Sequence, residues 1–381
     1  MTLIGMLHRR KDPTTVFKSY AYAISAKAEG AEFVFFTPKS VDFEKQCIYG
    51  KIYENGEWLD TVTRFPDVIY NASYVSSSAN DIVDKLQEVI PFTSYSIGDK
   101  LGVNDRLKVA KDFSQYLIPS EELHDWEQFI QQLSSFKEVV VKPVTGNKGK
   151  GIYFIKKLAD AFLIGHELEE QSLSLEQLKE FFHNQLEGND YLLQPYIRSV
   201  TKSGNSLDFR LHVQKNGQGK WVSTSIYPRI APPNTIVTNI SNGGYTSPLE
   251  SLLYYEYNHV EAFNIKRTLE YFSVALAKHL DEIQKDEFGE ELDELGIDVG
   301  IDQKKKLWIY EVNWRPGCPP LFYLELDVVR NTIHYAMFLV EKQKREHIKK
   351  QQGKRQTKNV TDRQSTDISF VSSFTKHQSK G

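Results

Sequence analysis

The stretch GIDVGIDQKKKLWIYEVNWRPG, residues 296–317, constrains the fold more than any other part of this chain. Residues 297–302 and 307–313 are strand-length apolar runs joined by the charged turn QKKK, which predicts an antiparallel hairpin. With Gln303 to Lys306 as the loop, Asp298 faces Glu311, and Asn313 shares the face of Glu311. The pattern indicates either a solvated strand face that carries two acids or a cation site on a half-buried sheet.

The chemistry of the opposed acids favours the cation site. Like charges directly across a strand pair are destabilising, and a divalent cation would turn this repulsion into binding. Asp298, Glu311 and Asn313 offer only oxygen donors, with further ligands left to water and phosphates. Such a set suits magnesium better than zinc.

A second feature is the glycine loop KPVTGNKGKG, residues 142–151, between the apolar runs EVVV and IYFI. A strand that ends in lysine, followed by a flexible glycine loop, can lay backbone N–H groups over phosphate oxygens. It is neither GxxxxGK[ST] nor GxGxxG opening a helix. An ordinary hairpin tip is the alternative, because Gly, Asn and Lys are common turn residues.

Two segments lie between these features. Residues 190–197, DYLLQPYI, form an apolar strand whose proline predicts an edge or a break in the ladder, leaving backbone groups open to an adenine edge. Residues 207–230 predict a hairpin with Asp208 and Arg210 on one face of its first strand and Arg229 late in its second. Two arginines can counter triphosphate charge, and surface salt bridges are the alternative.

Length and composition set the class of protein. A chain of 381 residues with 40% hydrophobic and 25% charged residues predicts two or three ordinary globular domains. No uncharged apolar run approaches 18 residues, so neither a secretory signal nor a membrane span is expected. Cys47 and Cys318 lie far apart without a CxxC motif, which favours a reducing, cytoplasmic setting.

The N-terminal part alternates strands and helices. Residues 2–7 and 32–37 predict strands, with a helix over 14–30 between them. A hairpin over 47–63 turns at Asn55-Gly56, and a strand at 65–71 and helices at 79–90 and 104–117 follow, the last with Asn104 as N-cap. Helices over 261–283 and 324–343 should pack on the later sheet, with His334 a packed or partly exposed histidine rather than a ligand.

The C-terminal tail differs from the rest. From Lys342 onwards eleven Lys and Arg residues stand against three Asp and Glu, so the tail carries +8 in a chain of net charge −3. It is predicted to be disordered beyond a short helical start. It could bind nucleic acid, an anionic coat polymer or a membrane face, and a solubilising extension is the alternative.

In this order the motifs resemble the ATP-grasp superfamily across about residues 100–340. The opening FVFFTPKSVDFEKQCIYGKIYENGEWLDTVTRFPDVIYN is similar to that of the YheC/YheD endospore coat-associated family. The resemblance implies an α/β and α+β protein of the ATP-grasp fold. Its parts are an N-terminal α/β domain over 1–100, a lid subdomain over 101–195, a larger metal-bearing subdomain over 196–341 and the tail over 342–381.

The resemblance also implies roles for individual residues. Lys142 would contact the α and β phosphates of ATP, and Asp208 the ribose. Arg210 and Arg229 would stabilise the transferred phosphoryl group. Asn239, in TNISNGG, would approach phosphate or metal. The glycine loop with Gly146, Lys148, Gly149 and Gly151 would close over the β and γ phosphates, Gln194, Pro195, Tyr196 and Ile197 would bind adenine, and Asp298, Glu311 and Asn313 would hold Mg²⁺.

The sequence departs from the family pattern at two places. Relatives commonly carry an Asp-Lys pair before the first helix of this region, where this chain has Asp105-Arg106 with Lys108 nearby. After the metal-binding Asn they often have small residues, where this chain has Trp314 and Arg315. Arg315 and the short loop of small and polar residues SNGGYTSP are candidate substrate contacts.

The resemblance implies an ATP- and Mg²⁺-dependent ligase that joins a carboxylate to an amine through an acyl phosphate, with spore-coat components as candidate partners and a cytoplasmic or spore-associated location. Two alternatives remain: a nucleotide-binding scaffold without turnover, and a kinase of the same fold. A ligase needs both a carboxylate and an amine to release ADP, a kinase needs one acceptor, and a scaffold releases none.

Overall fold

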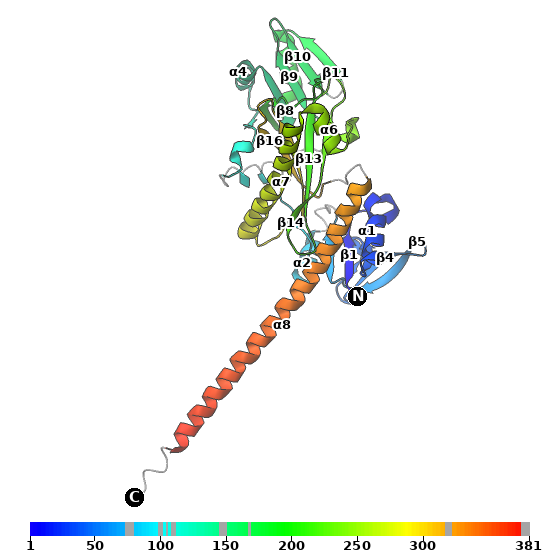
Figure 1. Cartoon of the computed structure of the whole chain (residues 1–381), viewed down its shortest axis with the longest axis vertical. Coiled ribbons are helices and arrows are strands. Elements are labelled where there is room, and N and C mark those ends of the chain that lie inside the picture. Colours follow the sequence, from blue (N-terminus) through cyan, green and yellow to red (C-terminus); the bar gives the residue numbers. More distant parts are fainter. Residues whose placement is uncertain are drawn as a thin grey trace.

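The computed structural model describes residues 1–72, 80–97, 102–103, 106–107, 112–144, 151–166, 169–316 and 322–374. In this part of the chain three sheets follow one another along the sequence, and helices cover them (Figure 1). The mixed α/β and α+β architecture predicted from the sequence is confirmed.

The first sheet is built around β1, which is buried at every residue and runs parallel to β2 and β6. The predicted hairpin is present, with Asn55 (φ 51°) and Gly56 (φ 90°) both left-handed, as a tight two-residue turn requires. The strand order is β3-β4-β2-β1-β6, with β5 paired to β4. The elements are β1 (Leu3–Leu7), η1 (Pro13–Thr15), α1 (Phe17–Ala28), β2 (Glu32–Phe36), η2 (Pro38–Ser40), β3 (Val41–Asp42), β4 (Cys47–Glu54), β5 (Glu57–Arg64), β6 (Val68–Asn71) and α2 (Asn80–Val89).

The second sheet is antiparallel, with the order β11-β10-β9-β8-β12-β7. Phe129, Leu133 and Phe182 pack on one face, against Val139 and Val141. Strand β12 ends at its proline, as the sequence predicts. The elements are η4 (Ser114–Tyr116), β7 (Glu121–Glu122), α4 (Trp126–Phe136), β8 (Glu138–Pro143), β9 (Tyr153–Lys157), β10 (Phe162–His166), β11 (Glu169–Leu173), α5 (Leu175–Phe181), the π-helix η5 (Phe182–Leu186) and β12 (Tyr191–Pro195).

The third sheet has the order β14-β13-β15-β16, and all its pairs are antiparallel. Side chains alternate between two faces, so Phe209 and Leu211 pack with Leu269 and Leu276 of α7 while their neighbours point away. One face is therefore apolar and covered by a helix. The elements are β13 (Leu207–Lys215), β14 (Trp221–Ile230), η6 (Ile240–Asn242), α6 (Leu249–Glu256), α7 (His259–Phe288), β15 (Glu294–Ile301) and β16 (Leu307–Trp314).

Helix α8 (Phe322–Phe374) connects two of these sheets. Its first turns place Val329, Ile333 and Ala336 in the core of the first sheet, and the helix also contacts β13 and β14 of the third. His334 is 30% exposed and pairs with Glu29 at 2.8 Å.

The tail differs from its prediction. The sequence predicts disorder beyond a short helical start, whereas the structure continues α8 to Phe374 as a rod that projects from the sheets (Figure 1). The segment is rich in Lys, Arg and Gln and contains no proline, and these residue types favour a helix. Among the helices of the described residues, none combines the length and apolarity that crossing a membrane requires.

The junction between the first and third sheets gives a prediction for stability. Burial, with the neighbouring charge of Glu294, raises the pKa of Asp293 to about 7. In the unfolded chain the Asp293 carboxyl ionises at about pH 4. Between about pH 4 and pH 7 the folded protein therefore holds a proton that the unfolded chain has lost. The free energy of unfolding falls as the pH rises through this range. The variant Asp293→Asn has no carboxyl to titrate at this position, so it lacks this pH-dependent decrease. Its free energy of unfolding, relative to that of wild type, should therefore rise by about 3 kcal/mol between pH 5 and pH 8.

Urea unfolding followed by tryptophan fluorescence at the two pH values measures this gain. The control is Asp60→Asn, whose side chain is 87% exposed, and its difference from wild type should stay within about 0.5 kcal/mol at both. An equal difference for Asp293→Asn at the two pH values would contradict the prediction.

Candidate functional site

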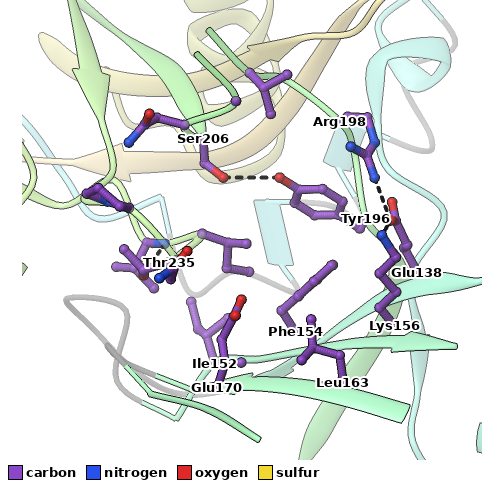
Figure 2. A pocket seen from close by; sticks show the side chains of 18 of the residues that line it. Glu138, Ile152, Phe154, Lys156, Leu163, Glu170, Tyr196, Arg198, Ser206 and Thr235 are labelled. Atoms are coloured by element: carbon purple, nitrogen blue, oxygen red, sulfur yellow. Dashed lines mark hydrogen bonds and ion pairs between the residues drawn. The ribbon is translucent and has the colours of Figure 1, made fainter. Parts of the chain in front are cut away.

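A cavity of about 320 Å³, the cleft, separates the second sheet from loops that flank the third (Figure 2). Glu138, Phe154 and Lys156 line it from the face of the second sheet that the helices leave uncovered. The opposite wall comes from residues 203–206 and 233–237. A cavity of this size is within the range that holds small ligands in proteins.

The segment after β12 closes one side of the cleft. Tyr196 packs edge-on against Phe154, with ring centroids 4.9 Å apart, and its hydroxyl lies 3.1 Å from the Ser206 hydroxyl (Figure 2). Glu138 binds Lys156 at 3.2 Å and Arg198 at 2.5 Å. An aromatic wall therefore sits beside a charged rim, where a planar ring with polar edges would fit.

Two predicted nucleotide residues of the second sheet, Lys142 and Gln194, lie on the same face, whereas Pro195 faces Val139 on the other. Lys142 is four residues after Glu138 in β8, and the strand period places both side chains on the cleft side. Gln194 faces Val140 across the β8–β12 pair and accepts a hydrogen bond from Ser120 at 3.2 Å. The Ile197 carbonyl accepts the N–H of Ser199 at 2.9 Å.

Of the glycine loop, residues 142–144 and Gly151 are described. Gly146, Lys148 and Gly149 lie outside the described residues. Gly151 has φ +71°, a conformation that favours glycine, and an added Cβ would lie 3.3 Å from the Pro143 ring. The chain at Gly151 therefore needs glycine to fold back onto the end of β8.

The face of the third sheet opposite α7 carries a chain of alternating charges, the charged quartet Asp208, Arg229, Asp298 and Arg210. Arg229 donates to Asp208 from Nε at 2.7 Å and from Nη2 at 2.6 Å. Its Nη2 also lies 2.9 Å from Asp298, whose other partner is Arg210, through Nη2 at 3.0 Å and through Nε. Bidentate pairs of this kind hold guanidinium groups in fixed orientations.

All four members of the quartet are largely buried, and each depends on its neighbours. Burial raises the pKa of Asp208, against the opposing charge of Arg229. Burial would also raise the pKa of Asp298, but the charges of Arg210 and Arg229 outweigh it and hold that pKa below its usual value. The Asp298 carboxylate is therefore ionised at neutral pH because two arginines contact it.

The predicted hairpin is present, and Asp298 faces Glu311. The route to this register differs from the prediction. Next to the turn, Ile301 faces Leu307, so the pairing there is shifted by one residue from the predicted pairing. A bulge at Tyr310 then restores the predicted pairing. Asn313 faces Gly296, where an added Cβ would lie 3.1 Å from Arg210 Nη1 and 2.5 Å from Pro316. A glycine at this position leaves room for the guanidinium beside Asn313.

The TNISNGG segment lies next to the quartet. Thr238 donates its hydroxyl to Asp208 at 2.6 Å. The carbonyl of the adjacent Asn239 accepts the N–H groups of Asn242 and Gly244, at 2.9 and 3.1 Å. The fold therefore brings this loop to the outer end of the charged quartet.

Residues 89–339 match a family model described as YheC/D like ATP-grasp. The chain belongs to this family. It is 27% identical to the endospore coat-associated protein YheD of Bacillus subtilis (strain 168), over 88% of this chain and 76% of that one. It is 24% identical to the endospore coat-associated protein YheC of the same organism, over 76% and 81%.

Among solved structures, the chain resembles that of D-cycloserine synthetase DcsG, with a TM-score of 0.50 at 13% identity over 89% of this chain and 99% of that one. At this identity the likeness concerns the fold alone. The ATP-grasp fold implied by the sequence is thus confirmed.

The structure places the two departures from the family pattern in different surroundings. Arg106 donates to the Ile97 carbonyl at 2.7 Å and to Gln284 at 2.8 Å, and its guanidinium lies 4.6 Å from the Phe288 ring. These partners include α7, which covers the apolar face of the third sheet, so Arg106 lies away from the cleft. Asp105 and Lys108 lie outside the described residues. Arg315 stacks on Trp314 at 3.3 Å, directly after β16.

Sequence reasoning missed a buried pair on the face of the quartet. His212 lies 2.7 Å from Glu294, and both side chains are almost fully buried. Burial lowers the pKa of His212, against the opposing effect of Glu294. The two-residue period that places Asp208 and Arg210 on one face also places His212 there, so its position could have been predicted, whereas its partner on β15 could not.

The quartet predicts a large loss of stability in Arg229→Met. The substitution leaves Asp208 buried without its arginine and removes one of the two partners of Asp298. Breaking one side of a buried ion pair should lower the free energy of unfolding at pH 7 by about 3–5 kcal/mol. Urea unfolding measures the change.

The added substitution Asp208→Asn should restore part of this loss, because the buried charge is then removed as well. Arg267→Met, on the exposed side of α7, is the matched control and should change stability by about 0.5 kcal/mol or less. A loss below about 1 kcal/mol in Arg229→Met would show that the quartet does not hold the sheet face.

Proposed function

We propose that this YheC/D-like ATP-grasp protein binds ATP with Mg²⁺ in the cleft and joins a carboxylate to an amine through an acyl phosphate. The observation that carries the proposal is the pairing of Asp298 with Glu311 beside two arginines fixed in orientation. Opposed acids next to guanidinium groups of fixed orientation are suited to a metal-bound triphosphate, because the carboxylates can hold Mg²⁺ and the arginines can contact phosphate oxygens.

In this proposal the adenine lies along Gln194, Pro195, Tyr196 and Ile197, beside the aromatic wall of the cleft. Lys142 contacts the α and β phosphates, and the loop with Gly146, Lys148, Gly149 and Gly151 closes over the β and γ phosphates. The shared face of Lys142, Glu138 and Gln194 supports this arrangement. Asp208, whose oxygens accept bonds from Arg229 and Thr238, would contact the ribose at the outer end of the quartet.

The donor chemistry of the hairpin fits Mg²⁺. Within the residues that the structure describes, no three His, Cys, Asp or Glu side chains form a metal-binding group. An ion held by Asp298, Glu311 and Asn313 would therefore complete its ligands with phosphate and water oxygens, as Mg²⁺ commonly does. Bound there, Mg²⁺ would neutralise charge on the β and γ phosphates.

The reaction would proceed in two steps. A carboxylate oxygen attacks the γ phosphorus and ADP leaves, with Arg210 and Arg229 stabilising the charge on the transferred phosphoryl group. An amine then attacks the acyl carbon, phosphate leaves and the amine loses a proton. Asn239, at the outer end of the quartet, would approach the phosphates. The protein contributes position and charge, and no covalent enzyme intermediate is required.

A kinase and a non-catalytic scaffold remain the competing functions. A kinase would use the same phosphate and metal residues and transfer phosphate to a single acceptor. A scaffold has little physical need for opposed acids, so the presence of Lys142 with Asp298, Glu311 and Asn313 favours turnover. The endospore coat-associated names of the relatives support coat components as substrates or partners and a spore-associated location, and a cytoplasmic location belongs to the same proposal.

Thermal unfolding with a non-hydrolysable ATP analogue and Mg²⁺ tests the binding site. At about 100 times its dissociation constant the ligand should add about 2.7 kcal/mol to the stability of wild type. Glu311→Gln and Lys142→Ala should each weaken this gain, because each removes a charge that the triphosphate complex contacts. Lys157→Ala is the control, since Lys157 binds Ser134 on the helix side of the second sheet.

The outcomes separate the three functions. A Mg²⁺-dependent shift that both variants weaken, with ADP released only when an amine and a carboxylate are both present, supports the ligase. ADP release with a single acceptor would support a kinase. No shift at millimolar nucleotide in a folded sample would overturn nucleotide binding at this site.

A further inference from the structure

A second cavity, the edge pocket, lies at the carboxyl ends of the parallel strands β1 and β2. Its volume is about 890 Å³. Arg9 and Lys11 line it after β1, residues 37–40 line it after β2, and the β4–β5 hairpin forms its third wall. In open α/β sheets the carboxyl ends of the strands are where ligands bind.

The charge of the edge pocket favours an anionic ligand. Its lining includes the cationic side chains of Arg9, Lys11 and Lys39 and one carboxylate, that of Asp60. Asp60 is bound to Lys51 at 2.7 Å, so its charge is compensated from outside the lining. Because the cations come from two separate loops, they suit a ligand with more than one anionic group.

The hairpin adds an apolar wall. Tyr49 and Val62 face each other across β4 and β5, and they remain 48% and 60% exposed. Gly50 fixes the hairpin against β2, since an added Cβ would lie 2.5 Å from Val34 and 2.9 Å from the Phe35 carbonyl. The wall is therefore held in place, and a ligand could cover its exposed apolar surface.

The third feature is the outer edge of β5. Within the described residues β5 pairs only with β4, and three consecutive β5 residues, 60–62, line the edge pocket. A strand edge of this kind offers backbone N–H and C=O groups to an extended chain. A peptide is therefore favoured over a nucleic acid, whose phosphates would use the cations but not the strand edge.

We propose that the edge pocket binds an extended acidic peptide, with its carboxylates on Arg9, Lys11 and Lys39 and its backbone added to the outer edge of β5. Apolar parts of the peptide would cover Tyr49 and Val62. Binding needs no nucleotide.

The edge pocket also lies near the end of the metal hairpin. Lys18, on the helix that follows β1, donates to the Pro316 carbonyl at 3.2 Å. Burial, together with the charges of Arg10, Arg9 and Arg315, lowers the pKa of His8 to about 4. The loop after β1 thus approaches the residues that follow Asn313. That the peptide is a substrate rests on the proposed function, whereas its binding does not.

Fluorescence anisotropy of a labelled deca-glutamate peptide with the full chain, without nucleotide, tests the proposal. Lys11→Glu with Lys39→Glu should weaken binding about tenfold or more, because two attractive charges become repulsive. The matched control, Lys285→Glu with Lys304→Glu, changes the net charge equally at exposed positions far from the pocket and should leave the affinity within about twofold. Equal affinity of the two double variants would overturn the proposal and assign the binding elsewhere, for example to the basic tail.

Two further arms test the kind of ligand. Two deca-glutamate peptides are compared, one N-methylated at the odd residues and one at the even residues. If the peptide backbone pairs with β5, one of the two should bind more weakly than the other. Unchanged binding of both peptides would overturn strand addition. A ten-nucleotide single strand that binds more tightly than the peptide, and loses binding in the Lys11→Glu/Lys39→Glu variant, would assign the pocket to nucleic acid instead. Retention of the nucleotide-dependent thermal shift in that variant would show that its fold and cleft are intact.

Discussion

The interaction on which the rest of the structure depends is the chain of alternating charges formed by Asp208, Arg229, Asp298 and Arg210. Four ionised groups on a largely buried sheet face are tolerated only because each acid contacts an arginine and each arginine an acid. The arrangement follows from an antiparallel register that sets Asp208 opposite Arg229 and Arg210 opposite Asp298. The sheet thus holds two guanidinium groups at fixed positions beside the proposed metal ligands.

The rest of the molecule surrounds this face. Helix α7 covers the apolar side of the third sheet, and the charged quartet lies on the opposite side. Helix α8 packs against both the first and third sheets, and Trp314 donates to Ser94 at 2.8 Å across the same junction. The edge pocket lies at the first sheet and the cleft at the second, so the two cavities belong to different sheets.

Much of the fold could be predicted from local patterns. The βαβ unit, the Asn55-Gly56 hairpin and the long helix α7 follow from periodicity and turn chemistry. The facing of Asp298 and Glu311 was also predicted correctly, but through two deviations that cancel, a longer turn and a bulge at Tyr310. The extent of α8 was not predicted, because the charged composition of the tail suits both a solvated coil and a solvated helix.

The sequence by itself determined on which face of each strand the candidate site residues lie, because a strand alternates its side chains with a fixed period of two. It also determined the family, through the order of its motifs. The tertiary structure alone decided the partners: that Asp208 holds Arg229, that His212 meets Glu294, and that Arg106 lies against α7 instead of the cleft. These pairings join residues up to 178 positions apart, and such contacts are set by how sheets and helices pack, which no local pattern records.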